Sequence, residues 1–162
     1  MTTLDASRQR LPGWIWKSVV AGLCGQITHT LLVSFKVHAG WLPSFQPYEA
    51  LQKTLSALIG SDVPAIIPWA ISYLNGMTVI ALIFGCSYKL LPGRHGMTKG
   101  LSVGILVWLI MGSAFFPLVG LGFFARDLRL GFKPALFSLT MVEAYSLVMG
   151  TVFALLNRES WT

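Results

Sequence analysis

Charged residues are scarce in this sequence, and their scarcity excludes an ordinary soluble domain. Of the 162 residues only 11% are Asp, Glu, Lys or Arg, whereas 54% are hydrophobic. A soluble domain carries about 25% charged residues. The mean hydropathy is +0.67, and long uncharged stretches recur along the chain. This composition is typical of an integral membrane protein.

A clustered basic surface is also missing, although the net charge is +6. The lysines and arginines lie between apolar runs and form no basic cluster interleaved with aromatic residues, so nothing favours a nucleic-acid partner. Basic residues at the ends of apolar runs set the orientation of membrane helices and meet anionic lipid headgroups. We therefore expect membrane lipids as partners and no nucleic acid.

Metal-ligating residues are few. Cys24 and Cys86 belong to no CxxC pair, so a zinc or iron–sulfur site is not expected. Both cysteines lie toward the predicted cytoplasmic half of the membrane, which argues against a disulfide. We expect no metal and no cofactor. The alternative that remains is a haem held by His29, alone or with Met111 or Met141 as a second ligand.

Motifs for catalysis are absent as well. The chain has no HExxH, no P-loop and no pair of neighbouring carboxylates in an apolar run. One segment, GLSVG at residues 100–104, matches the letters of GxSxG, but it lies inside an apolar run and not at the strand-to-helix turn that exposes such a serine. We therefore predict no catalytic residues and no enzymatic activity.

Four long apolar runs are present instead, over residues 14–35, 64–88, 99–124 and 134–156. Each reaches the roughly 20 residues that a helix needs to cross a hydrocarbon core of about 30 Å, and none alternates as a barrel strand would. The short connections KLLPGRHGMTK and ARDLRLGFK make consecutive helices antiparallel neighbours. We predict an all-α, four-helix membrane bundle that forms one transmembrane domain over residues 1–162.

The longest loop contains a further helical pattern at residues 47–59. The apolar positions on its helical face are Leu51, Leu55, Leu58 and Ile59. Pro47 suits the first turn of this helix and Gly60 suits its end. We predict a short amphipathic helix in this first external loop. It is either a connector whose apolar stripe lies in lipid, or a docking face or lid.

The distribution of basic residues predicts the orientation of the bundle. One side of the membrane receives seven of them: Arg8, Arg10, Lys17, Lys89, Arg94, Lys99 and Arg158. The other side receives five: Lys36, Lys53, Arg126, Arg129 and Lys133. Because cytoplasmic segments carry the excess of basic residues, both termini are predicted to be cytoplasmic.

Three glycines are predicted to lie at helix contacts. Gly22 and Gly25 share a helix face with His29, since their spacings are three and four residues. Gly104 holds a position equivalent to that of Gly22, because each follows a lysine by five residues in two similar Pro-Gly segments. Glycines allow membrane helices to approach closely, so His29 is expected to face the bundle and not the lipid.

Glu143 is the only acidic residue deep in any apolar run, and a lone carboxylate in lipid needs a partner or a proton. At 1.5 Å per residue, His29 lies about 9 Å, Glu143 about 14 Å and Asn75 about 16 Å from the same predicted surface. We therefore infer a buried cluster of these three residues, with Gln26 as a further member. It is either a structural hydrogen-bond cluster or a site that handles protons or a ligand.

Two further stretches place proline and aromatic residues at the predicted outer face: GWLPSFQPYEALQ and FFPLVGLGFFA. Together with LPGR after the second apolar run, they resemble an uncharacterised bacterial family of small four-span inner-membrane proteins. The resemblance covers residues 14–156. It implies the fold and the membrane location, and it carries no activity and no functional residues.

These features favour a small non-catalytic accessory or assembly subunit that packs against a larger membrane complex or against copies of itself. A complex of energy transduction is the class we expect. The alternative is an independent membrane protein, such as an oligomeric transporter, that handles protons or a small molecule through the His29–Glu143 cluster.

Overall fold

The computed structural model describes residues 13–157, and these residues form an all-α four-helix bundle without a strand. The first span is α1 (Gly13–His38). The second joins α3 (Ile66–Leu74), η1 (Asn75–Ile80) and α4 (Ala81–Ser87), and the third joins α5 (Gly96–Ile110), η2 (Met111–Phe115) and α6 (Phe116–Leu118). The fourth is α7 (Lys133–Asn157), and the loops contain α2 (Pro47–Ile59) and the 3₁₀ helix η3 (Phe123–Leu128).

Four helices in the described part of the chain are long and apolar enough to cross a membrane, which makes this a multi-pass membrane protein. They begin and end close to the predicted boundaries, with one exception. The third span was predicted to reach Phe124 but ends at Leu118. Pro117 cannot continue the helical hydrogen bonds, and Gly120 and Gly122 then take positive φ angles of 77° and 74°. Arg8, Arg10 and Arg158 of the charge count lie outside residues 13–157.

Two spans contain a π-helical segment. In the third span, η2 ends two residues before Pro117. A proline ring inside a helix crowds the carbonyl four residues earlier, here that of Ser113, and a wider turn relieves such crowding. In the second span, η1 contains no proline. It packs closely against α1: a Cβ added to Gly76 would stand 2.7 Å from Cδ of Gln26. The π-helical segments η1 and η2 therefore lie where the chain is constrained by a proline or by close packing against a neighbouring helix.

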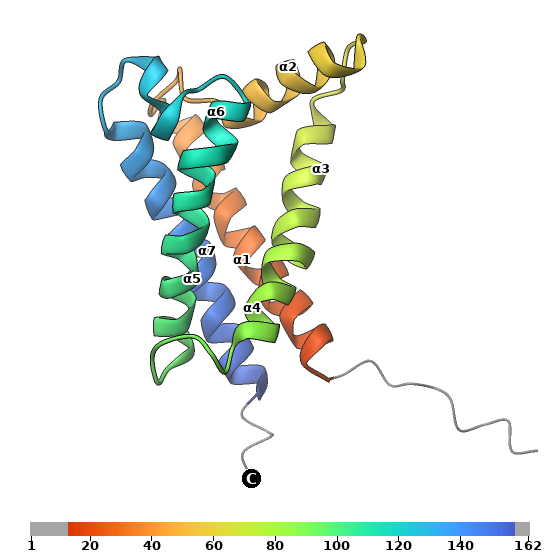
Figure 1. Ribbon diagram of the computed structural model, residues 1–162, viewed down its shortest axis with the longest axis vertical. Coiled ribbons are helices and arrows are strands. Elements are labelled where there is room, and N and C mark those ends of the chain that lie inside the picture. The colour runs from red at the N-terminus through yellow and green to blue at the C-terminus, as the bar shows by residue number, and fades with distance from the viewer. Residues whose placement is uncertain (1–12, 158–162) are drawn as a thin grey trace, which may run out of the picture.

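The helices α1 and α7 lie side by side at the centre of the bundle (Figure 1). On one side η1 and α4 pack against α1, and on the other α5 packs against α7. Figure 1 shows α2 crossing one end of the bundle, which we call the α2 end. The described chain begins and finishes at the opposite end, where Nζ of Lys17 donates to Oδ1 of Asn157 at 3.1 Å.

Two groups of buried side chains hold the bundle together. The first joins all four spans and consists of Ala21, Ala81, Phe84, Val103, Tyr145, Met149 and Phe153. The second, the α2-end cluster, consists of Phe45, Phe116, Val119, Leu121 and Ala125. The α2-end cluster is built from the loop before α2, the end of the third span, and the loop and 3₁₀ helix that follow it. This end of the protein is therefore a packed cap and not a set of loose connections.

Backbone strain is concentrated in the same cap. Leu42, Phe124, Ala125 and Arg129 have positive φ angles, which are unfavourable for residues other than glycine. Ala125 is fully buried, and the ring of Phe124 occupies the space that a side chain on Gly112 would need. Tertiary packing thus holds these residues in conformations that their local sequence does not favour.

The predicted amphipathic helix is present as α2. Pro47 begins it, and Gly60 ends it with a φ of 75° and an N–H that donates to the carbonyl of Ser56 at 2.9 Å. Its apolar stripe is divided. Leu51 packs against the α2-end cluster, whereas Leu58 and Ile59 at the far end of the helix are 78% and 65% exposed.

Candidate functional site

The predicted polar cluster does not form as one site. His29 and Glu143 have no hydrogen bond to each other, because neither carboxyl oxygen of Glu143 has a hydrogen-bond partner within residues 13–157. The ring of His29 lies edge-on to Tyr48 with centroids 6.5 Å apart, so it belongs to a group that joins α1, α2 and α3. Glu143 lies at the contact between α5 and α7. The prediction that the two residues pair is therefore wrong.

Hydrogen bonds from α1 hold the half of the second span that lies nearer the α2 end. Nε2 of the buried Gln26 donates to the carbonyl of Ser72 at 2.9 Å. One turn further, Oγ1 of Thr30 and the hydroxyl of Tyr73 lie 2.5 Å apart. Gln26, predicted as a further member of the polar cluster, thus donates to the backbone of the second span and not to the carboxyl group of Glu143.

Aromatic stacking attaches α2 to the same place. The ring of Tyr48 stacks on Trp69 with centroids 4.1 Å and planes 17° apart, and its hydroxyl lies 3.1 Å from Oγ of Ser72. Burial raises the pKa of the Tyr48 phenol, so it remains a neutral hydroxyl at neutral pH. Sequence reasoning missed Tyr48. A signal was available, because Tyr48 lies three and seven residues before Leu51 and Leu55 and therefore on the same helix face.

Asn75 is exposed and does not belong to any buried cluster, so its predicted place there is wrong. It lies at the expected height along the second span, but its side chain is on the outward face of the helix. The next residue, Gly76, is the one that is buried against α1.

Glu143 occupies a recess that Gly104 leaves on α5. A Cβ at Gly104 would stand 2.8 Å from Oε1 of Glu143, so a larger residue would displace the carboxyl group. Both carboxyl oxygens are buried, and so is Oγ of Ser146 one turn along α7; within the described residues none of these atoms has a hydrogen-bond partner. Glu143 is thus a titratable group held in an apolar interface.

The three predicted packing glycines all lie at close contacts between spans. A Cβ on Gly22 would stand 2.6 Å from Cβ of Ala81, and one on Gly25 would stand 2.7 Å from the ring of Tyr145. Gly104 faces Glu143, as described above. The hydroxyl of Tyr145 continues past α1 and donates to the carbonyl of Gly76 at 2.5 Å, which joins α7 to η1.

A second set of glycines was not predicted, and it brings the backbones of two spans into direct contact. Gly96 and Gly100 of α5 lie against Gly150 and Ser146 of α7, so near that a Cβ on either α5 glycine would overlap a backbone carbonyl oxygen. The signal was the spacing of four residues in GMTKGLSVG, which places Gly96, Gly100 and Gly104 on one stripe.

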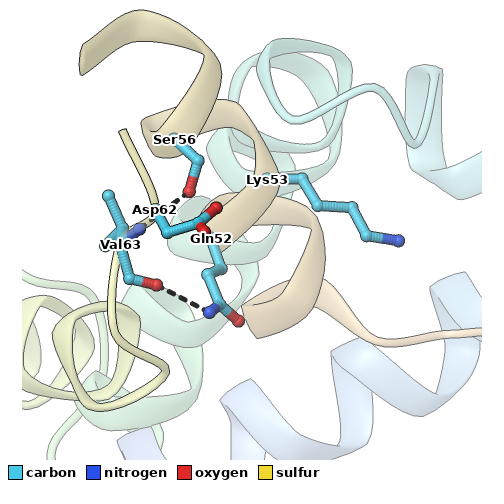
Figure 2. A pocket seen from close by; sticks show the side chains of 5 residues that line it. All are labelled: Gln52, Lys53, Ser56, Asp62 and Val63. Atoms are coloured by element: carbon cyan, nitrogen blue, oxygen red, sulfur yellow. Dashed lines mark hydrogen bonds between the residues drawn. The ribbon is translucent and has the colours of Figure 1, made fainter. Parts of the chain in front are cut away.

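No group of three or more His, Cys, Asp or Glu side chains within residues 13–157 is arranged to hold a metal ion. A shallow hollow of about 380 Å³ lies at the corner between α2 and α3, lined by Gln52, Lys53, Ser56, Asp62 and Val63 (Figure 2). Its polar atoms mostly bind one another: N–H of Val63 donates to Oγ of Ser56 at 3.0 Å, and Nε2 of Gln52 donates to the carbonyl of Val63 at 2.7 Å. These bonds shape the corner, and Lys53 points away from it in Figure 2.

Comparison with protein families gives a match over nearly the whole chain. A family model described as "Family of unknown function (DUF6789)" matches residues 13–162. No curated protein and no solved structure matches the chain.

Proposed function

We propose that this chain, which belongs to the family of unknown function DUF6789, is a non-catalytic accessory or assembly subunit of a larger membrane complex. We place it in a bacterial inner membrane with both termini in the cytoplasm and expect the complex to be one of energy transduction. Reporter fusions at His95 and Ser56 test the orientation: the first should read cytoplasmic and the second external, and the reverse result would overturn it.

The closed interior of the bundle is the observation that carries the proposal. Backbones of α5 and α7 touch along Gly96, Gly100 and Gly150, and large aromatic side chains fill the contact between α4 and α7. The hollow between α2 and α3 and a second one lined by Trp41 and Leu136 both lie at the α2 end. A chain packed in this way acts through its outer surface, by contact with other molecules.

The α2 end offers a surface for such contact. Leu58 and Ile59 at the end of α2 and Ile66 at the start of α3 are 78%, 65% and 68% exposed. They lie at the corner where α2 meets the second span, beyond the residues that α2 uses to pack on the bundle. An apolar corner of this kind suits a docking contact with a neighbouring membrane protein.

Co-purification tests the proposal. After gentle detergent extraction, native electrophoresis with mass spectrometry should show this chain in a larger assembly. The double variant Leu58→Ser, Ile59→Ser should lower the amount of partner retained by at least about tenfold, because it removes apolar contact area from the corner. Leu90→Ser is the matched control, since Leu90 is 87% exposed at the opposite end of the bundle. Migration as a monomer, or equal loss of partner in both variants, would contradict the proposal.

Glu143 favours a second candidate function, a protein that handles protons within the membrane. An ionisable side chain inside a bundle marks a functional site more often than a structural one, because its charged form is costly in an apolar interface. His29 takes no part in this candidate, since it contacts Tyr48.

Infrared spectroscopy tests this candidate. The wild-type protein should show the band of a protonated carboxyl group that disappears reversibly as the pH is raised. Glu143→Gln should lack this band, and His29→Ala should keep it with an unchanged midpoint, because His29 and Glu143 are not in contact. A band that persists at every pH would identify a structural acid and exclude proton exchange.

A further inference from the structure

The larger of the two hollows lies at the α2 end, between the segment that follows α1 and the first turns of α7. Its volume is about 540 Å³. The residues that line it are Gly40, Trp41, Leu42, Lys133, Leu136, Phe137 and Thr140. Apart from Lys133 and Thr140, the side chains around it are apolar.

The α7 wall of this hollow is a single helix stripe. Lys133, Leu136, Phe137 and Thr140 follow one another at spacings of three, four and seven residues from the first, so they lie on one face. Lys133 is the first residue of the fourth span, and Thr140 lies about 10 Å deeper at 1.5 Å per residue. The stripe therefore begins with a positive charge at the membrane boundary and continues with apolar side chains toward the hydrocarbon.

The charge of Lys133 is not neutralised inside the protein. Its side chain is exposed and makes no ion pair or hydrogen bond with any residue from 13 to 157. The opposite wall contributes Trp41, which is 56% exposed and meets the ring of Phe35 edge-on at 5.7 Å. Tryptophan is favoured at the level of lipid headgroups, where one part of the ring is apolar and another can reach water.

We propose that this hollow binds an anionic phospholipid, with the lipid phosphate beside Lys133 and an acyl chain along Leu136 and Phe137. The charge of the lysine selects an acidic headgroup, since a zwitterionic lipid would bring its own cation to the same place. The apolar stripe below the lysine distinguishes this hollow from a site for free phosphate, because inorganic phosphate has no apolar part that could contact Leu136 and Phe137. The inference does not depend on the proposed function, because a lipid can occupy this hollow whether or not a protein partner binds elsewhere.

Native mass spectrometry of the full-length protein tests this inference. The protein in mild detergent is mixed with phosphatidylglycerol or with phosphatidylcholine of the same acyl chains. We expect the wild-type protein to retain phosphatidylglycerol preferentially, and Lys133→Gln to retain it about fivefold less. Lys53→Gln is the matched control, because Lys53 is an exposed lysine at the same end that does not line this hollow. This control should bind phosphatidylglycerol as the wild type does.

A second variant tests the apolar part of the site. Thr140→Trp should fill the lower half of the hollow and weaken retention of phosphatidylglycerol without changing the charge, with circular dichroism confirming that the helices remain. Inorganic phosphate should not compete at the concentrations at which the lipid binds. Equal retention of both lipids, equal effects of the two lysine variants, or displacement by inorganic phosphate would each overturn the proposal.

Discussion

Gly100→Leu should prevent α5 from packing against α7 and destabilise the whole bundle. A side chain at this position overlaps the carbonyl oxygen of Ser146, which belongs to the backbone of a long helix and cannot rotate away. Overpacking of a soluble core costs typically 1 to 3 kcal/mol. We expect a loss above about 3 kcal/mol here, because the two helices must separate along the stripe that also includes Gly96 and Gly104.

Reversible unfolding of the purified protein in mixed micelles measures this loss. Ala114→Leu is the matched control, because it adds a similar volume on the exposed side of the same span. The control should change the free energy of unfolding by less than about 0.5 kcal/mol, as surface substitutions usually do. If Gly100→Leu were as stable as the control, the backbone contact between α5 and α7 would be wrong.

Lys36→Ala should open the cap at the α2 end while the four spans stay folded. Lys36 is only 4% exposed, its ammonium group donates to the carbonyl of Phe45, and it lies 5.3 Å from the centre of the Phe45 ring. Its removal should lower the free energy of unfolding by about 2 to 4 kcal/mol, since a hydrogen bond from a charged donor contributes about 1.5 to 3 kcal/mol and the buried stem adds packing.

Limited proteolysis checks where the Lys36 variant opens. Cleavage should increase in residues 39–46 and 119–132, which surround the α2-end cluster, and not in residues 88–95 at the opposite end. Lys36→Met separates the contribution of the hydrogen bond from that of side-chain packing, because methionine keeps an apolar side chain of similar length but has no donor. Lys36→Met should therefore lower the free energy of unfolding by less than Lys36→Ala does. Equal cleavage of wild type and Lys36→Ala would mean that the lysine does not hold the cap.

The transmembrane spans could be predicted because a bilayer imposes its length on any continuous apolar run. Pro47 and Gly60 likewise marked the ends of α2 through their local conformational preferences. The predicted end of the third span lies six residues too far along the chain, because Val119, Leu121 and Ala125 are apolar but are buried in protein instead of lipid. Hydropathy does not distinguish these two surroundings.

The candidate site could be predicted only in part, because height along a helix is one of two coordinates that place a side chain. His29, Asn75 and Glu143 were assigned similar heights, but the direction in which each points decides its neighbours. His29 points toward α2, Asn75 outward, and Glu143 toward α5. Helix periodicity relates residues within one span and carries no information about the rotation of one span relative to another.

The cap at the α2 end was beyond sequence reasoning for a different reason. Its contacts join residues that lie far apart in the chain, such as Phe45 and Phe116, whose rings meet edge-on at 5.6 Å. The positive φ angles of Phe124 and Ala125 oppose the local preference of these residues. Only packing between distant segments selects such conformations.

The position of α1 beside α7 has a consequence for biosynthesis. Gly25 receives the ring of Tyr145, which the ribosome adds 120 residues later. At about 5 to 20 residues per second this delay is about 6 to 24 s. During that time Gln26 can already reach the carbonyl of Ser72 on the second span, so its amide need not face lipid alone. The first two spans can therefore wait in the bilayer as a hairpin, and the arrival of the last span completes the bundle.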